Sequence, residues 1–297
     1  MKALIDHITT QLLDLYPEDE ARSLAWWIME ETTGLSRSEI LSGCKDTKNI
    51  PNLQTIIDRL HHFEPIQYIF GHTLWAGLDL KVTPATLIPR PETAELVDRI
   101  DRFAERAKTA SLKEQRPLHV MDVGTGSGCI SIALKKRHPE WQVTGIDISA
   151  EAIEVAKENA ARNDVQIDFQ VADIFDSNGQ IRQSPITNHQ YDIIVSNPPY
   201  ICESEKATMR PNVLDYEPAS ALFVPDDDPL RVYRRIAELF ANLQSPITNH
   251  QSKFLFFEIH EVFSSELSAL LTNLGYTDIQ ITNDIYGKPR IIEGRMA

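Results

Sequence analysis

Cysteine is scarce in this chain of 297 residues, which contains only Cys44, Cys129 and Cys202. The three lie far apart in the sequence, so no disulfide framework is expected and the thiols suit a reducing, cytoplasmic compartment. The nine histidines show neither H-E-x-x-H nor Cys/His ligand spacing. We therefore predict that the protein binds no metal ion.

Basic residues and long apolar runs are also in short supply. Lysine and arginine number 29 against 43 aspartates and glutamates, which gives a net charge of −14 and a pI near 5.1. Such an acidic protein is not expected to bind nucleic acid or anionic membranes non-specifically. No apolar run approaches membrane-spanning length, and Asp6 comes too early for a signal peptide. We expect a cytoplasmic monomer without nucleic-acid or membrane partners.

Residues 1–70 are predicted to form a small helical domain. Apolar residues at helical spacing predict helices at 2–15, 18–33 and 52–63, and Ser36-Arg-Ser-Glu39 is typical of a capping box that opens a short helix. Six basic and eleven acidic residues give this domain a net charge of −5. Its surface should therefore not bind a phosphate backbone.

Residues 71–90 have a different pattern. Leu78, Leu80 and Val82 alternate with polar residues, which predicts a strand, and Gly77 and Pro84 mark turns on either side. We predict a β-hairpin linker that joins the helical domain to residues 91–297.

Residues 91–297 alternate between predicted strands and helices, which indicates an α/β fold with a mostly parallel sheet. Such sheets bind ligands at the carboxyl ends of their strands. The predicted strands, including a closing pair at the end of the chain, are 118–123, 141–147, 166–171, the apolar run 193–195, 254–259, 279–281 and 290–292.

A glycine-rich loop, Gly124-Thr-Gly-Ser-Gly128, joins the first of these strands to a helix. Glycines let the backbone approach a ligand and the helix N-terminus offers free N–H groups, so cofactor binding is favoured over a simple tight turn. Asp147 lies 19 residues beyond Gly128, at the end of the next strand. Its carboxylate can accept hydrogen bonds from both ribose hydroxyls of an adenosine group. The alternative for Asp147 is an acid that stabilises the helix N-terminus after Ser149.

The same loop argues against a dehydrogenase. The dinucleotide fingerprint G-x-G-x-x-G requires a third glycine where this chain has Cys129. A loop of this kind leaves no room for a pyrophosphate.

The stretch Asn197-Pro-Pro-Tyr200 ends a buried apolar run, Ile193 to Val195. Two prolines cannot continue a central strand, because neither has an N–H to donate. Asn197 is therefore held at the carboxyl end of the strand. An isolated N-P-P-Y is equally compatible with a proline-rich turn.

Taken together, the glycine loop, the acid at the second strand end and N-P-P-Y resemble S-adenosylmethionine-dependent methyltransferases that act on planar amide or amino nitrogens. Longer motifs make the sequence resemble the release factor glutamine methyltransferase family over most of its length. These motifs are Pro65–Gly71, Leu87–Thr93, Asp122–Cys129, Asn197–Tyr200, Tyr216–Pro218 and Asp284–Arg290. The resemblance implies a Rossmann-like, seven-stranded methyltransferase domain with a small N-terminal helical domain, and S-adenosylmethionine as cofactor.

The resemblance further implies methylation of the side-chain nitrogen (N5) of the glutamine in the Gly-Gly-Gln motif of peptide chain release factors 1 and 2, which modulates translation termination. A primary amide alone cannot identify such a substrate, so we expect residues 1–70 to dock a second region of the release factor.

The predicted site residues divide by role. The Asn197 side-chain oxygen and the Pro198 carbonyl should accept the two amide hydrogens of the substrate, while Tyr200 packs on the flat amide and Pro199 completes the slot. Gly124, Thr125, Gly126, Ser127 and Gly128 should lie against the methionine part of the cofactor, with Asp147 on the ribose and Asn197 also bordering the cofactor. The resemblance implies that Ile174 flanks the adenine.

The sequence departs from the family pattern at Val224–Asp228, where a glycine-rich segment is usual, and at His260, where glycine is usual.

Three alternative functions stay open. Ribosomal-protein glutamine methyltransferases share N-P-P-Y but tend to lack the Arg-Pro-Glu-Thr form at 90–93. An adenine-N6 DNA methyltransferase would need a basic DNA-reading surface. A binding module without activity is disfavoured by the intact cofactor loop and Asn197.

An exact octapeptide repeat stands apart from these motifs. Residues 183–190 recur as residues 244–251. Both copies are polar, contain proline and precede a predicted strand, so we interpret them as loop insertions on the face of the sheet opposite the ligand crevice.

Overall fold

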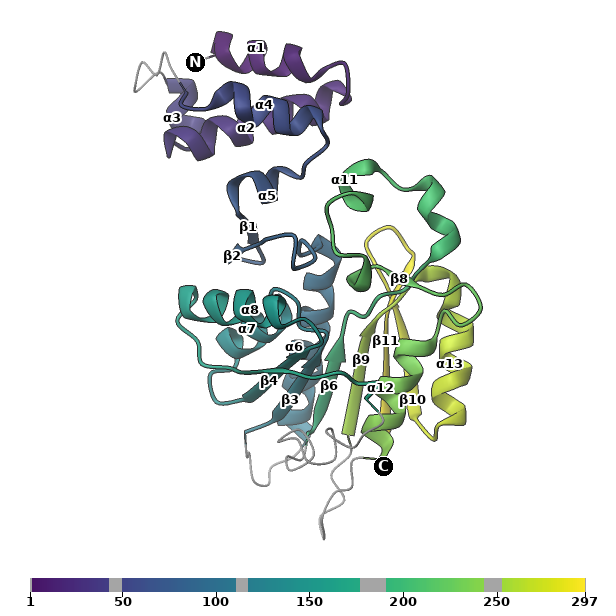
Figure 1. The fold of residues 1–297 in the computed structure, drawn as a ribbon. Coiled ribbons are helices and arrows are strands. Elements are labelled where there is room, and N and C mark those ends of the chain that lie inside the picture. Colours follow the sequence, from purple (N-terminus) through teal and green to yellow (C-terminus); the bar gives the residue numbers. More distant parts are fainter. Residues whose placement is uncertain (1, 43–49, 111–116, 177–190, 243–252, 297) are drawn as a thin grey trace. The chain divides into compact units, whose positions relative to one another are not determined.

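The computed structural model describes residues 2–42, 50–110, 117–176, 191–242 and 253–296 (Figure 1). Both copies of the octapeptide repeat lie outside these ranges. The chain forms two compact units, Met1–Gly71 with Arg210–Tyr216, and His72–Met209 with Glu217–Ala297. No helix within the described ranges is long and apolar enough to cross a membrane.

The first unit is helical, as predicted. Its helices bury one apolar stripe each, with Ile8 on the first, Ile28 on the second and Leu60 on the fourth all at most 1% exposed. The helices are α1 (Lys2–Leu12), α2 (Glu18–Thr33), α3 (Arg37–Ser42), α4 (Leu53–His61), α5 (Ile66–Phe70) and α11 (Pro211–Leu214). The predicted capping box is confirmed, because the Ser36 N–H donates to Glu39 Oε2 at 2.9 Å and the Glu39 N–H donates to Ser36 Oγ at 3.4 Å.

Residues 210–216 belong to the first unit although they are distant from it in sequence. The Arg210 guanidinium donates to both carboxylate oxygens of Glu20, at 3.1 and 2.9 Å. The Tyr216 hydroxyl donates to the His62 carbonyl at 2.8 Å. The chain therefore leaves the second unit after Met209, completes the first unit and returns at Glu217.

The second unit is built on a seven-stranded sheet with the order β10-β11-β9-β6-β3-β4-β5. The five strands from β9 to β5 in this order run parallel, whereas β11 runs antiparallel to both of its neighbours, β9 and β10. This agrees with the predicted strands and closing pair. The strands are β3 (His119–Val123), β4 (Gln142–Asp147), β5 (Asp168–Val171), β6 (Ile193–Ser196), β9 (Lys253–Glu258), β10 (Thr277–Asn283) and β11 (Pro289–Met296).

Helices cover both faces of this sheet (Figure 1). One face carries α6 (Pro91–Ala110), α7 (Cys129–Arg137) and α8 (Ala150–Arg162), and the other carries α12 (Arg231–Asn242) and α13 (Ser264–Asn273). Side chains alternate between the two layers, so Phe256 joins the core under α6–α8 and Phe257 joins the core under α12 and α13. A sheet covered on both sides explains why its central strands are apolar at nearly every position.

Shorter elements complete the second unit. Strands β1 (His72–Trp75) and β2 (Leu78–Lys81) form the predicted antiparallel hairpin, whose turn residues Ala76 and Gly77 both have positive φ. The Asn159 side chain of α8 donates to the Lys81 carbonyl at 2.9 Å, which ties the hairpin to this unit. The remaining elements are β7 (Ile201–Cys202), η1 (Glu203–Thr208), η2 (Ala219–Ala221), β8 (Phe223–Val224) and η3 (Glu261–Phe263).

Gly145 in β4 leads to a prediction about stability. A methyl group there would lie 2.5 Å from the Phe169 ring and 2.9 Å from Thr125 Oγ1. We expect Gly145→Ala to lower the free energy of unfolding by about 1–3 kcal/mol, because close-packed cores do not absorb an added methyl group. Urea denaturation checks this. Gly294→Ala in β11 is the control, since its nearest neighbour would lie at 3.4 Å. Equal stability of the two variants would contradict the prediction.

Candidate active site

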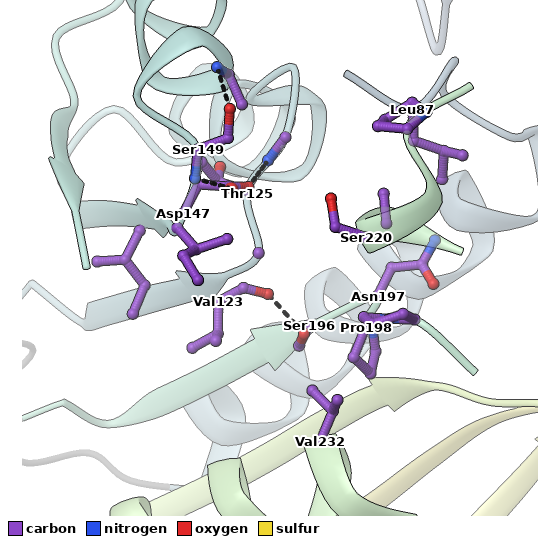
Figure 2. Close-up of a pocket in the computed structure, with 18 of the residues that line it drawn as sticks. Leu87, Val123, Thr125, Asp147, Ser149, Ser196, Asn197, Pro198, Ser220 and Val232 are labelled. Carbon is purple, nitrogen blue, oxygen red and sulfur yellow. Dashed lines mark hydrogen bonds between the residues drawn. The ribbon is translucent and has the colours of Figure 1, made fainter. Parts of the chain in front are cut away.

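A cavity of ≈ 350 Å³ opens at the carboxyl ends of β3, β4 and β6 in the second unit. This is where an open α/β sheet binds its ligands. Figure 2 shows Thr125, Asp147 and Ser149 on one side of the cavity, and Leu87, Ser220 and Asn197 on the other. Its size is that of a pocket for a small molecule.

The glycine-rich loop forms one wall. The backbone N–H groups of Gly124 and Thr125 both donate to the Ile146 carbonyl at 2.9 Å, which fixes the loop against the end of β4. Gly124 and Gly126 have φ of +72° and +53°, and a side-chain carbon at either would meet no atom within 4 Å. The wall therefore presents bare backbone to open space, which lets a ligand approach it closely.

Asp122 holds this loop from behind. It is fully buried, and its Oδ2 accepts hydrogen bonds from Thr125 Oγ1 at 2.7 Å and from Ser131 Oγ at 2.8 Å. Burial raises the pKa of the Asp122 carboxyl to about 6, although both hydroxyl bonds favour its charged form. Asp122 thus links the loop to helix α7.

Asp147 ends β4 and lines the cavity. Its Oδ2 accepts the Gly126 N–H and its Oδ1 accepts the Ser149 N–H, both at 2.9 Å. Burial raises the pKa of the Asp147 carboxyl, and these backbone bonds oppose that effect. Each oxygen keeps a lone pair for a further donor, so the fixed carboxylate can still receive two hydroxyl groups.

An apolar end of the cavity is formed by residues after β5. Ile174 and Phe175 line it, and the Arg231 guanidinium lies 4.5 Å from the centroid of the Phe175 ring. The Arg235 side chain donates to the Ile174 carbonyl at 2.6 Å, which fixes this segment against α12. The apolar surfaces of Ile174 and Phe175 at this end of the cavity suit a flat apolar group.

The N-P-P-Y segment forms the opposite wall. Ser196 Oγ donates to the Val123 carbonyl at 2.6 Å, which locks the ends of β6 and β3 together (Figure 2). Asn197, Pro198 and Pro199 follow and line the cavity. The Asn197 side-chain nitrogen donates to Thr93 Oγ1 at 3.2 Å.

A partly buried ion pair holds the rim next to this wall. Arg90 Nη2 donates to Glu217 Oε1 at 2.6 Å, and the Ile88 N–H donates to Glu217 Oε2 at 3.2 Å. Glu217 is only 6% exposed. Segment 85–90 and the residues after Glu217 both line the cavity, so this pair fixes two parts of its wall at once.

The two departures from the family pattern cause no backbone strain. His260 has φ −71°, a value open to any residue, and its ring accepts the Val262 N–H at 3.1 Å while contacting Glu205 at 3.3 Å. Asp226 accepts hydrogen bonds from the Ser204 N–H and hydroxyl, and Asp228 pairs with Arg234 at 2.8 Å.

The structure brings most of the predicted site residues to one cavity, whose lining includes Gly124, Thr125, Gly126, Ser127, Asp147, Ile174, Asn197, Pro198 and Pro199. Two predicted residues lie outside this lining. Gly128 is the residue before α7, where a methyl group would meet Ala156, Ile132 and Phe169 at 3.2 Å. Tyr200 packs in the core under α12 and donates its hydroxyl to Glu258 Oε1 at 3.3 Å.

Sequence reasoning missed four residues at or behind the cavity, namely Thr93, Glu217, Arg231 and Glu258. Thr93 and Glu217 fall inside Leu87–Thr93 and Tyr216–Pro218, two of the motifs that carry the family resemblance. Glu258 is an acid at the end of an apolar strand, which is a recognisable signal. Arg231 lies at the start of an amphipathic helix, and the sequence around it gives no signal of a functional role.

Two families match this chain in part, one described as "Methyltransferase small domain" over residues 98–214 and one as "PrmC N-terminal domain" over residues 3–71. Relatives named "Release factor glutamine methyltransferase" are similar over nearly the whole length. That of Bacteroides thetaiotaomicron is 41% identical over 299 residues, which cover 98% of this chain and 99% of the relative. That of Flavobacterium psychrophilum is 40% identical over 297 residues, covering 98% of each.

Among solved structures, the hMettl16 catalytic domain in complex with MAT2A 3′UTR hairpin 6 is similar at a TM-score of 0.52. The two chains are 15% identical, and the match covers 74% of this chain and 76% of the other. At that identity the likeness concerns the fold alone. With the two family matches, the predicted α/β methyltransferase fold with an N-terminal helical domain is confirmed.

The matched methyltransferase domain makes S-adenosylmethionine the cofactor, as predicted. The cavity fits this molecule, because bare glycine backbone faces open space at Gly124 and Gly126 and a fixed carboxylate stands at Asp147. The apolar surface of Ile174 and Phe175 suits a base.

Asp147→Ala should weaken S-adenosylmethionine binding by about 10- to 100-fold, since charge-assisted hydrogen bonds contribute about 1.5–3 kcal/mol. Calorimetric titration measures the affinity. Asp168→Ala is a matched control, because this acid lies at the opposite end of the neighbouring strand β5 and does not line the cavity. Unchanged affinity in Asp147→Ala would remove this carboxylate from the cofactor site.

Proposed function

Because this chain belongs to the release factor glutamine methyltransferase family, we propose that it methylates the side-chain nitrogen (N5) of the glutamine in the Gly-Gly-Gln motif of peptide chain release factors 1 and 2. This modification modulates translation termination. One observation carries the proposal. The Asn197 side chain and the Pro198 backbone lie at the end of β6, in the same cavity as the Asp147 carboxylate.

The cavity lining supports the cofactor roles that we propose. Gly124 to Ser127 would lie against the methionine part, Asp147 would accept the ribose hydroxyls, and Ile174 would flank the adenine. Gly128 supports this wall through the packing of α7. When bound, S-adenosylmethionine supplies an electrophilic methyl group on a sulfonium.

The chain's own residues must compensate for a weak nucleophile. The lone pair of a carboxamide nitrogen is delocalised into its carbonyl, and an ordinary side-chain base cannot remove its proton. The Asn197 side-chain oxygen and the Pro198 carbonyl each accept one amide hydrogen of the substrate. Their hydrogen bonds strengthen as positive charge develops on the nitrogen, so they stabilise the transition state more than the ground state.

The prolines and the tyrosine orient the substrate. Pro198 and Pro199 give this segment a stiff backbone, because each ring fixes its own φ. Tyr200 is held by Glu258 through its hydroxyl and by an edge-on contact with His260 at 5.8 Å between ring centroids. We propose that its ring limits rotation of the substrate amide, which keeps the nitrogen in line with the methyl group.

Substrate selection requires a second surface. Free glutamine and many proteins carry the same primary amide, so the slot itself cannot select a release factor. The first unit offers exposed acidic side chains, such as Asp14 after α1 and Glu18 at the start of α2. We propose that this surface docks a basic region of the release factor, and that the remote binding energy positions the Gly-Gly-Gln loop.

Asn197→Ala should lower kcat by about a hundredfold or more, on the scale of losing one group that stabilises a transition state. Mass spectrometry of the Gly-Gly-Gln peptide, released from intact release factor after reaction, measures the rate. Circular dichroism should show an unchanged fold. Asn273→Ala, at the exposed end of α13, is the control. Wild-type activity in Asn197→Ala would refute the catalytic assignment.

Charge reversal in the first unit tests the docking surface. Removal of residues 1–70 is unsuitable, because Arg210 and Tyr216 would lose their partners. The variant Asp14→Lys with Glu18→Lys should lower kcat/KM on intact release factor by about tenfold or more at low salt, a change of about 1.4 kcal/mol. A short Gly-Gly-Gln peptide should be a poor substrate for both enzymes.

The matched control reverses two exposed acids of the second unit, Glu105 and Glu266, and should retain wild-type kcat/KM. If the wild-type enzyme showed equal kcat/KM on the short peptide and on the intact release factor, the docking proposal would be contradicted. Methylation of duplex DNA adenine with none on release factor would contradict the proposed function itself.

A further inference from the structure

A buried carboxylate, Glu258, stands behind the N-P-P-Y wall. It is the last residue of β9 and is 1% exposed. Its Oε2 accepts a hydrogen bond from Thr93 Oγ1 at 2.7 Å, and its Oε1 accepts one from the Tyr200 hydroxyl at 3.3 Å. Thr93, near the start of α6, is 2% exposed and in turn accepts the Asn197 side-chain N–H at 3.2 Å.

This chain of hydrogen bonds has only one possible direction while Glu258 is ionised. A carboxylate can only accept, so the single hydroxyl proton of Thr93 must point at Glu258. The Thr93 oxygen can then only accept from its other neighbour, Asn197. The Asn197 nitrogen is thereby held toward Thr93.

The direction matters because the two ends of a carboxamide have the same shape and opposite hydrogen-bonding properties. An Asn197 side chain rotated by half a turn would present N–H groups to the substrate amide, which also carries N–H groups. Two donors cannot pair, so only one of the two orientations receives a substrate nitrogen.

We propose that Glu258 and Thr93 are positioning residues that orient the Asn197 carboxamide, with its oxygen available to the amide nitrogen that is methylated. This inference rests on the proposed function of the site. Neither residue touches the reacting atoms in this scheme; both act through Asn197.

Burial outweighs the neighbours that favour the charged form of Glu258, so that form, which the relay requires, prevails only above about pH 7. Burial raises the pKa of the Glu258 carboxyl to about 7, while the Thr93 hydrogen bond, the charge of Arg290 and the Tyr200 hydrogen bond lower it. Arg290 is itself hydrogen-bonded to Asp284 at 3.1 Å. Removing the Thr93 hydroxyl therefore removes the largest of the influences that favour the carboxylate.

Substitutions of Thr93 test the relay with little change of shape. Thr93→Val keeps the volume and loses the hydroxyl, whereas Thr93→Ser keeps the hydroxyl. We expect Thr93→Val to lower kcat on intact release factor by about 10- to 100-fold. The KM for S-adenosylmethionine should change by less than about threefold, and Thr93→Ser should recover most of the lost kcat. Thr73→Val on β1, another buried threonine but outside the site, should behave as wild type.

A second measurement does not depend on the substrate. The side-chain amide signal of Asn197 in a ¹⁵N spectrum can be assigned by its loss in Asn197→Ala. Its hydrogens should exchange with solvent at least about tenfold faster in Thr93→Val than in wild type or Thr93→Ser, because the bond to Thr93 protects one of them.

The outcomes separate the two ideas. Equal exchange in wild type and Thr93→Val, wild-type kcat in Thr93→Val, or a loss of kcat that Thr93→Ser fails to restore would each overturn the relay. A wild-type enzyme that does not methylate release factor would refute the proposed function, and the exchange rates would still decide the orientation of Asn197.

Discussion

Burying a carboxylate costs free energy unless hydrogen-bond donors surround it, and the second unit faces this constraint twice beside its cavity. Behind the glycine loop, Asp122 receives the hydroxyls of Thr125 and Ser131. Behind the N-P-P-Y wall, Glu258 receives the hydroxyls of Thr93 and Tyr200. Each wall of the cavity is thus held by hydrogen bonds to a buried carboxyl group.

The sheet brings these two walls together. Strand β3 lies between β4 and β6, and their carboxyl ends carry the glycine loop, Asp147 and Asn197 respectively. The bond from Ser196 to the Val123 carbonyl holds the two walls in register. Parallel pairing therefore converts three distant sequence motifs into one binding surface, without any contact between the motifs being encoded locally.

Local sequence patterns predicted most of this arrangement. Apolar runs located the strands because both sheet faces are covered, and the glycines and prolines located the loops because only these residues suit such backbones. What stayed hidden depends on contacts between distant residues. Thr93 and Glu258 are 165 positions apart, and no sequence pattern around either residue predicts their hydrogen bond. The sequence places Tyr200 beside the slot but gives no sign that its hydroxyl donates to that same buried carboxylate.

The attachment of Arg210–Tyr216 to the first unit has a consequence for how the protein is made. A ribosome delivers the chain from its N-terminus, and domains generally fold as they emerge. Here the N-terminal unit lacks α11 and the partner of Glu20 until Tyr216 has been synthesised. By then β3, β4, β5 and β6 have already been made, while β9, β10 and β11 have not. The unit that is translated first is therefore completed only midway through the sheet of the second, and the folding of the two is interleaved in time.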